Sequence, residues 1–288
     1  MYKKPKILIA GGDMRQIYCC RKLAENFDAS LTGFDERYLP DNENIRPADL
    51  SADHSYDCAV LPVPPLDEKG NIFSPCSSGE VSPDDILRLL KKDGIVFAGK
   101  ADSRLREIFS PHEVCDYILR ESFALNNAVP TAEGAVGIAL AELPVTINGM
   151  KVLVTGMGRI GTALVGILRG FGADVSVAVR SAAGAAKVRI SGAKPVCMSD
   201  MAADHALVFN TVPEIIFTED VLRRFPDDTL FIDLASKPGG IDLSAAAELG
   251  RKVVWASGLP GKTAPVTAGE ITASAVADIL SERGDSNG

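Results

Sequence analysis

Short apolar runs alternate with helically spaced apolar residues through the first part of the chain. The runs whose length and continuity are typical of strands buried on both faces of a sheet are residues 7–10, 31–34, 58–63 and 95–98. Residues 14–26 and 84–92 instead carry apolar side chains at helical spacing. Residues 64–82 are rich in Pro and Gly and predict a long loop. Because parallel strands need helical crossovers, the alternation predicts a doubly wound parallel sheet.

The same alternation returns after residue 150. The apolar runs that predict strands are residues 151–155, 175–179, 195–197, 207–210, 230–234 and 253–256. The segments that predict helices between them are residues 163–171, 182–191, 219–224 and 243–249. A second parallel sheet is therefore expected in this part of the chain.

Two further helices are expected outside these alternations. Pro130 and Thr131 suit the start of a helix at residues 131–143, where Glu133 would favour the positive N-terminal end. A last helix is expected at residues 269–280, after the final strand. We expect the first of these helices to link the two sheets and the second to pack back on the first sheet.

Composition narrows the range of functions. The chain has 288 residues, enough for two domains, and 46% hydrophobic with 24% charged residues is typical of a globular protein. A net charge of −8 argues against nucleic-acid binding through a basic surface. No apolar run or N-terminal pattern predicts a membrane span or a signal peptide. The six cysteines form no Cys-x-x-Cys pair and the three histidines are scattered, so we expect no metal site and reduced thiols in the cytoplasm.

A glycine loop carries the clearest chemical signal. The sequence Gly-Met-Gly-Arg-Ile-Gly begins at Gly156, directly after an expected strand and before a helix. The first glycine permits a tight turn, Gly158 lets the backbone approach a pyrophosphate, and Gly161 lets helix and strand pack closely. Arg159 and Ile160 open the helix, whose N-terminal N–H groups favour phosphate. The loop predicts a dinucleotide site, and the alternative is a glycine-rich turn without a ligand.

The end of the next strand bears on the choice of cofactor. Many NAD-binding domains carry an Asp or Glu there, which accepts a hydrogen bond from the ribose 2′-hydroxyl. Here the strand ends in Arg180 and Ser181, and no carboxylate follows before Asp200. Arg180 can pair with a 2′-phosphate and Ser181 can donate to it, so we predict NADP as the cofactor. The alternative is that Arg180 is a solvated residue at a strand end.

Polar loops rich in Gly and Pro follow three strands of the second sheet: residues 210–213, 233–240 and 258–265. Because ligands bind outside the carboxyl ends of parallel strands, these loops indicate a nicotinamide and substrate site. Asn210, Thr211, Val212 and Pro213 are assigned to the cofactor. The alternative for any one loop is turn chemistry alone.

These elements predict an α/β protein with two doubly wound parallel-sheet domains, the second a Rossmann dinucleotide-binding domain. The expected segments are an N-terminal α/β substrate or partner domain at residues 1–125, a linking helix at 126–148, an NADP-binding domain at 149–266 and a C-terminal helix at 267–288.

Five motifs together resemble the dipicolinate synthase A-subunit family over nearly the whole chain. They are GGDMRQ at residues 11–16, NAVPTAEGA at 127–135, NTVP at 210–213, DLASKPGG at 233–240 and LPGKTAP at 259–265. Lys100 and Lys262 depart from the pattern, because uncharged residues are expected at these positions in the family.

The resemblance implies an NADP-linked oxidation in spore formation, in which a dihydro- or tetrahydrodipicolinate precursor becomes dipicolinate, the pyridine dicarboxylate of bacterial endospores. It also implies a partner, the flavoprotein-like B-subunit of dipicolinate synthase. Two alternatives stay open: another two-domain NADP-dependent dehydrogenase of a small carboxylate, or a non-catalytic dinucleotide-binding protein. Formation of a homo-oligomer is left open as well.

A dicarboxylate substrate needs fixed hydrogen-bond donors. Arg15 is assigned to one carboxylate because a guanidinium matches a carboxylate bidentately, with Asp13 orienting it. The alternative is that Arg15 is a surface helix residue. The other residues assigned to the substrate are Thr131, Ser236 and Lys262. Glu133 and Lys237 are the candidate catalytic groups for proton transfer, and the alternative for Glu133 is a charge at a helix start.

Overall fold

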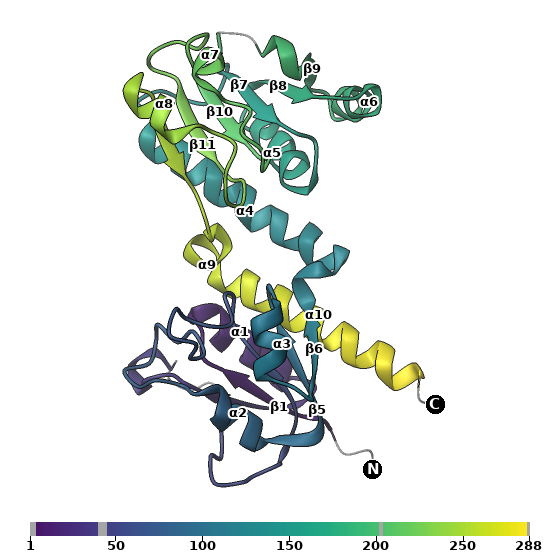
Figure 1. Ribbon diagram of the computed structural model, residues 1–288. Coiled ribbons are helices and arrows are strands. Elements are labelled where there is room, and N and C mark those ends of the chain that lie inside the picture. Colours follow the sequence, from purple (N-terminus) through teal and green to yellow (C-terminus); the bar gives the residue numbers. More distant parts are fainter. Residues whose placement is uncertain (1–3, 40–44, 202–203, 287–288) are drawn as a thin grey trace. The chain divides into compact units, whose positions relative to one another are not determined.

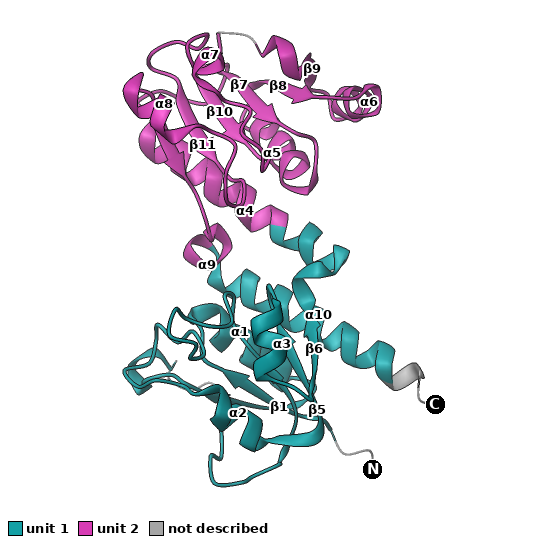
Figure 2. Cartoon of the chain, in the orientation of Figure 1, with its two compact units in different colours: residues 1–127, 264–288 teal, residues 128–263 magenta. Residues whose placement is uncertain are grey.

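The chain folds into two compact units, each built around its own parallel sheet. The computed structural model describes residues 4–39, 45–201 and 204–286 (Figure 1). Unit 1 consists of Met1–Asn127 and Ala264–Gly288, and unit 2 of Ala128–Thr263 (Figure 2). The chain leaves unit 1 inside helix α4 (Glu121–Glu142) and returns just before helix α10 (Pro265–Ser286). Unit 2 is therefore an insertion in unit 1.

The sheet of unit 1 has six parallel strands in the order β3-β2-β1-β4-β5-β6. The strands are β1 (Lys6–Ala10), β2 (Asp28–Thr32), β3 (Arg46–Pro47), β4 (Tyr56–Val60), β5 (Leu90–Ala98) and β6 (Glu113–Asp116). The helices of this unit are α1 (Met14–Ala24), α2 (Pro83–Leu89), α3 (Ser103–Ile108), the start of α4 and α10, with 3-10 turns η1 (Glu36–Tyr38) and η2 (Tyr117–Leu119). Two apolar clusters use alternate residues of β1, because successive side chains of a strand point to opposite faces.

The sheet of unit 2 has the order β12-β11-β10-β7-β8-β9, again all parallel. The strands are β7 (Lys151–Thr155), β8 (Asp174–Val179), β9 (Lys194–Cys197), β10 (Leu207–Asn210), β11 (Leu230–Asp233) and β12 (Lys252–Trp255). The other elements are α5 (Arg159–Gly170), α6 (Ala182–Ile190), η3 (Met198–Asp200), α7 (Glu219–Leu222), α8 (Leu243–Glu248) and α9 (Leu259–Thr263). An apolar cluster covers each face of this sheet.

Both sheets follow the doubly wound order in which the third, second and first strands are followed by the fourth, fifth and sixth. The predicted α/β fold with two such sheets is confirmed. The strand order reverses between β1 and β4 in unit 1 and between β7 and β10 in unit 2. A doubly wound sheet binds ligands in the loops at the carboxyl ends of these strands. We therefore expect a ligand site at each of these two positions.

Helix α10 completes unit 1. It lies beside α1 (Figure 1), and its Ala273, Val276 and Ile279 join the same apolar cluster as Ile7 and Ile9 of β1. Near its end, Arg283 donates to Glu113 of β6 at 2.9 Å. The last segment of the sequence is thus part of the core of the first unit.

Helix α4 differs from the prediction. A helix start was expected at Thr131, but α4 begins at Glu121 and Pro130 lies inside it. Proline lacks an N–H and disfavours helical backbone at the residue before it, which is why the sequence pattern indicated a boundary there. The loss of one backbone hydrogen bond is tolerated here. The segment expected as a separate link at residues 126–148 is therefore mostly the continuation of one long helix.

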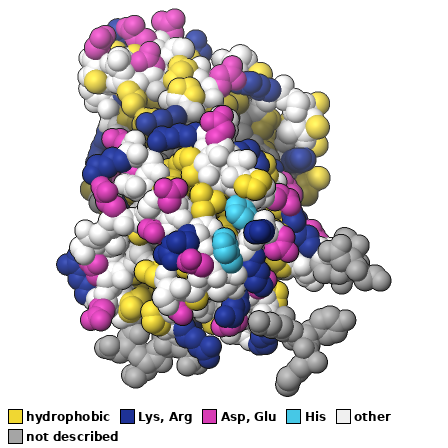
Figure 3. Space-filling model, turned by 60° about the horizontal axis from the view of Figure 1, so that its bottom comes forward, with side chains coloured by type: hydrophobic (Ala, Val, Ile, Leu, Met, Phe, Trp, Pro, Cys, Tyr) yellow, Lys and Arg dark blue, Asp and Glu magenta, His cyan; other side chains and the backbone are white. Residues whose placement is uncertain are grey.

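Three further observations concern membrane spans, surface charge and metal-binding side chains. None of the helices in the described part of the chain is both long enough and apolar enough to cross a bilayer. On the face drawn in Figure 3, Lys and Arg side chains are interspersed with Asp and Glu side chains. Among the described residues, no group of three or more His, Cys, Asp or Glu side chains is arranged to hold a metal ion.

Candidate dinucleotide and substrate sites

The glycine loop of unit 2 joins β7 to α5, and two of its glycines are required by contacts within the loop. Gly156 has a φ of +86°, which disfavours any residue with a side chain. A Cβ on Gly161 would lie 2.2 Å from the carbonyl oxygen of Gly156. The first turn of α5 can therefore approach the end of β7 only with glycine at position 161.

Gly158 differs from these two glycines. It is the N-cap of α5, and a Cβ built on it would meet no heavy atom within 4 Å. Its backbone therefore borders open space in front of the first turn of the helix. The N–H groups of that turn have no partners within the helix and favour an anion. Arg159, which is exposed, and Ile160, which is half-buried, open the helix as the sequence indicated. This arrangement fits a pyrophosphate.

A buried hydrogen-bond network supports the neighbouring strand ends. Thr155 Oγ1 donates to Asn210 Oδ1 at 2.5 Å, and Asn210 Nδ2 donates to Asp233 Oδ1 at 2.7 Å. Asn210 also accepts from the amide of Val212 at 3.1 Å and donates to its carbonyl at 3.0 Å. Both amide hydrogens and both oxygen lone pairs of Asn210 are thus used, and the residue is 0% exposed. Its side chain holds the loop from within, while Thr211 and Val212 are half-buried and Pro213 is exposed.

Asp233 fixes the next loop. Its carboxylate accepts from the amide of Ala235 at 3.0 Å and from the amide of Gly240 at 2.8 Å, so it ties together both ends of residues 234–240. Trp255 Nε1 donates to the carbonyl of Ala235 at 3.1 Å. Ser236 and Lys237, which lie between these anchors, are exposed. The two residues therefore stand at the carboxyl edge of β11, next but one to β7 in the sheet.

Two residues assigned to the site, Thr131 and Glu133, do not lie at the start of a helix as expected. Thr131 and Glu133 lie in the interior of α4 rather than at its N-terminus, so the argument from the positive helix end is wrong. Thr131 is buried and Glu133 is exposed. Residues two apart do not share a face of a helix, so the pair does not form one site on α4. Lys262 is exposed on α9.

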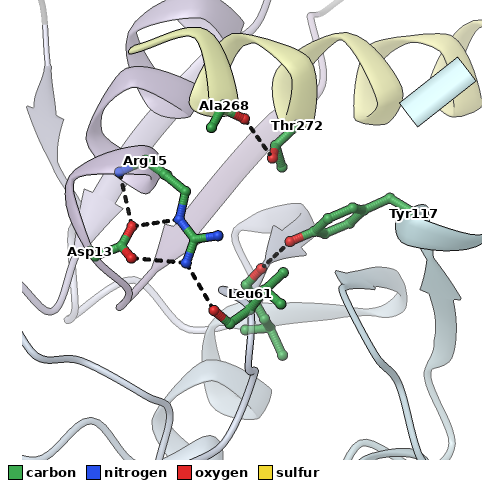
Figure 4. A network of polar contacts seen from close by, with 7 residues as sticks. Asp13, Arg15, Leu61, Tyr117, Ala268 and Thr272 are labelled. Carbon is green, nitrogen blue, oxygen red and sulfur yellow. Dashed lines mark hydrogen bonds and ion pairs between the residues drawn. The ribbon is translucent and has the colours of Figure 1, made fainter. Parts of the chain in front are cut away.

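Asp13 and Arg15 form a bidentate pair in unit 1 (Figure 4). Arg15 Nε donates to Asp13 Oδ1 and Nη2 to Asp13 Oδ2, both at 2.8 Å, and Nη2 also donates to the carbonyl of Val63 at 2.9 Å. Burial lowers the pKa of Arg15, but the hydrogen bond and charge of Asp13 outweigh burial and raise that pKa above its ordinary value. The bidentate edge predicted to bind a substrate carboxylate is thus occupied by Asp13. The Nη1 atom makes no hydrogen bond to a described residue.

A pocket adjoins this pair. It encloses about 320 Å³ including its open mouth, and Arg15, Gln16, Tyr117, Phe123 and Thr272 are among the residues that line it. Burial raises the pKa of Tyr117, so its hydroxyl keeps its proton and donates to the carbonyl of Leu61 at 3.2 Å (Figure 4). The pocket lies where the strand order of unit 1 reverses, because its walls include the loops after β1 and β4.

The glycines after β1 serve a different purpose from those after β7. The amide of Gly12 donates to the carbonyl of Phe73 at 2.7 Å, and a Cβ on Gly11 would lie 2.3 Å from Ser74 Oγ. The long loop predicted at residues 64–82 therefore packs directly on the turn where a dinucleotide-binding domain would hold its phosphates. Unit 1 has the strand order of such a domain, but its own chain fills that position.

The strand-end residues predicted to bind a 2′-phosphate lie at the end of β8. Ser181 is the N-cap of α6, and its side-chain oxygen accepts from the amide of Gly184 at 3.0 Å. Arg180 Nη2 donates to Glu214 Oε2 at 2.6 Å. The sequence pattern did not indicate Glu214, because an acidic partner of the ribose was expected only after the strand at residues 175–179. The signal for it is its place directly after Pro213, in a loop already assigned to the cofactor.

Comparison with known proteins gives consistent matches over both units. Residues 6–117 match the N-terminal domain of the dipicolinate synthase A-subunit, and residues 120–239 match the NAD-binding domain of D-isomer-specific 2-hydroxyacid dehydrogenases. The chain is 32% identical to the dipicolinate synthase A-subunit of Bacillus subtilis (strain 168), with 96% of each chain covered.

Two solved structures resemble the whole chain. The crystal structure of the dipicolinate synthase A-subunit from Bacillus halodurans has a TM-score of 0.86 at 30% identity, covering 97% of this chain and 99% of that one. The corresponding chain of the Bacillus subtilis enzyme also has a TM-score of 0.86, at 31% identity, covering 98% of this chain and 97% of that one.

Proposed function

Because the chain belongs to the dipicolinate synthase A-subunit family, we propose that it carries out the NADP-linked oxidation of a dihydro- or tetrahydrodipicolinate precursor to dipicolinate in spore formation. The match to an NAD-binding domain supports an oxidoreductase role with a nicotinamide dinucleotide. The observation that carries the proposal is the glycine loop of unit 2, which leaves the first turn of α5 open to a pyrophosphate beside Gly158. The choice of NADP rests on Arg180 and Ser181 at the end of β8.

In the proposed reaction, a dihydropyridine ring loses one hydride and one proton and becomes aromatic, with both carboxylates retained. Bound oxidised dinucleotide supplies the hydride acceptor. The task of the chain is then to orient the ring and to exclude water, since positioning lowers the barrier of such a transfer. Glu133 and Lys237 stay our candidates for accepting the proton, and both side chains are exposed.

For the substrate, we propose that Arg15 binds one carboxylate through Nη1, the edge of the guanidinium that Asp13 does not use. Asp13 would act as a positioning residue that fixes the guanidinium. Ser236 and Lys237, in the loop after β11, and Lys262, on α9, are proposed as further donors, and Thr131 as a buried supporting residue. The proposed partner is the dipicolinate synthase B-subunit, the proposed location is the cytoplasm, and the chain could also form a homo-oligomer.

The test of the activity is a coupled assay with the purified chain, with and without the B-subunit. We expect NADPH and dipicolinate to appear in equal amounts when the dihydro precursor and NADP are supplied, because that ring loses one hydride on becoming aromatic. Gly158→Ala serves as the cofactor-site control and should lower both products together. Absence of NADPH formation when the B-subunit is present would overturn the proposal. Dinucleotide binding without turnover would instead favour a non-catalytic protein.

Replacing Arg15 tests the substrate assignment. We expect Arg15→Ala to raise the KM for the dicarboxylate about tenfold, because a charge-assisted hydrogen bond is worth roughly 1.5 kcal/mol. Dinucleotide affinity should not change, since Arg15 is assigned to the substrate carboxylate and not to the dinucleotide. Lys22→Ala is the matched control on the same helix, because Lys22 pairs with the exposed Glu25 at 2.8 Å. A loss of dinucleotide binding in Arg15→Ala would show that the assignment is wrong.

A further inference from the structure

Arg180 and Glu214 belong to loops on either side of the glycine loop. Arg180 directly follows β8, and Glu214 lies in the loop after β10. Strand β7, which ends in the glycine loop, lies between β8 and β10 in the sheet. Because neighbouring strands are about 4.8 Å apart, the two outer strand ends are separated by about 10 Å. Their ion pair, at 2.6 Å, therefore bridges the flanks of the loop proposed to hold the dinucleotide.

A ribose 2′-phosphate at the end of β8 would find three favourable groups. These are the guanidinium of Arg180, the hydroxyl of Ser181 and the N-terminal end of α6. The ion pair opposes this, because Glu214 neutralises the guanidinium that a phosphate would need. A carboxylate left beside a bound phosphate would also repel it. An unphosphorylated ribose meets neither obstacle, because its 2′-hydroxyl can donate to a carboxylate that is still paired with Arg180.

Building on the NADP site of the proposed function, we propose that Glu214 is a specificity-determining residue, which competes with the ribose 2′-phosphate for Arg180 and so limits the preference of the site for NADP over NAD. The carboxylate that many NAD-binding domains carry at the end of their second strand is here supplied from the loop after β10. Both side chains of the pair are more than half exposed, at 56% and 64%. Such exposed pairs alter an equilibrium by no more than about fivefold, so a phosphate can displace Glu214.

The test compares dinucleotide affinities of the full chain and its variants. Trp255 is the only tryptophan of the chain and lies at the end of β12, so energy transfer from it to the reduced nicotinamide ring reports binding of NADPH and NADH. We expect Glu214→Gln to tighten NADPH binding about fivefold and to leave NADH binding unchanged or weaker. Arg180→Ala should weaken NADPH more than NADH. Adding Glu214→Gln to Arg180→Ala should bring a smaller gain than Glu214→Gln alone, because only the repulsion between carboxylate and phosphate is then removed and no competition for the guanidinium remains. An equal gain in both backgrounds would overturn the proposed competition.

Glu219→Gln is the matched control, since it removes the same charge from a nearby exposed glutamate that pairs with Arg223 four residues along the chain. An equal effect of Glu219→Gln would overturn the proposal by attributing the change to net charge. An unchanged ratio of NADPH to NADH affinity in Glu214→Gln would overturn it as well, while leaving the proposed function intact. Failure of the wild-type chain to bind either dinucleotide would overturn both.

Discussion

Gly158→Ala is expected to weaken dinucleotide binding about 100-fold while unit 2 stays folded. The backbone of Gly158 has a φ of −82°, which alanine adopts freely, and the added methyl group meets no protein atom within 4 Å. The methyl group would instead occupy the space through which a pyrophosphate approaches the first turn of α5. Loss of two charge-assisted hydrogen bonds, at about 1.5 kcal/mol each, gives roughly this factor. Titration with NADPH, followed by fluorescence, measures the affinity.

Gly166→Ala is the control for this variant. Gly166 lies further along α5, and its Cβ would also meet nothing within 4 Å. Alanine there should stabilise the helix by about 1 kcal/mol and leave binding unchanged. Unaltered affinity in Gly158→Ala, with normal thermal unfolding, would contradict the position assigned to the pyrophosphate.

Asp233→Asn is expected to lower the free energy of unfolding of unit 2 by about 3 kcal/mol. Both carboxylate oxygens of Asp233 accept hydrogen bonds, from Asn210, from Ala235 and from Gly240. An asparagine must turn its own NH2 group toward one of these donors, which leaves buried N–H groups facing each other. Residues 234–240 would then lose one anchor. Denaturant unfolding followed by the fluorescence of Trp255, which bonds to Ala235, measures the change.

Asp242→Asn is the control for Asp233→Asn, because it removes the same charge from an aspartate outside the buried network. Asp242 is the N-cap of α8 and accepts from the amides of Ser244 and Ala245. Asparagine caps a helix as well as aspartate does, so Asp242→Asn should be close to neutral. Equal destabilisation in the two variants would argue against a special role for the network around Asp233.

The predicted elements held best where burial on both faces made the apolar pattern continuous. Residues 7–10 and 151–155 are the central strands of their sheets, and each was predicted within a residue of its observed start. The glycine loop could also be predicted from the sequence, because backbone geometry alone requires three glycines at this spacing in a dinucleotide-binding turn. Local physical rules were therefore sufficient to predict these central strands and to propose the phosphate site.

The prediction failed at Pro130 because the usual rule for proline is only a tendency. The residues before it continue as helix in spite of the missing N–H, so packing around α4 overrides the local signal. The same lesson applies to residues 84–92, predicted as one helix. Here the helix ends at Leu89 and β5 begins at Leu90, with both side chains buried.

The hydrogen-bond and ion-pair partners of the site residues could not be predicted from the sequence, because they depend on tertiary structure. The ion pair of Arg180 with Glu214 depends on two loops that flank β7, and the network of Asn210 depends on three neighbouring strand ends. Both require the order of strands in the sheet, which the sequence pattern does not supply. The pairing of Asp13 with Arg15 is local, but a two-residue spacing does not say whether a guanidinium faces a ligand or its own neighbour.

The insertion of unit 2 into unit 1 also sets an order for biosynthesis. A ribosome would release the whole of unit 2 before α10, so unit 2 can fold while its host still lacks a helix. Unit 1 cannot complete its core until α10 has been synthesised, because Ala273, Val276 and Ile279 of α10 belong to the cluster that covers one face of β1. Truncation near the carboxyl terminus would accordingly damage the half of the protein that was translated first.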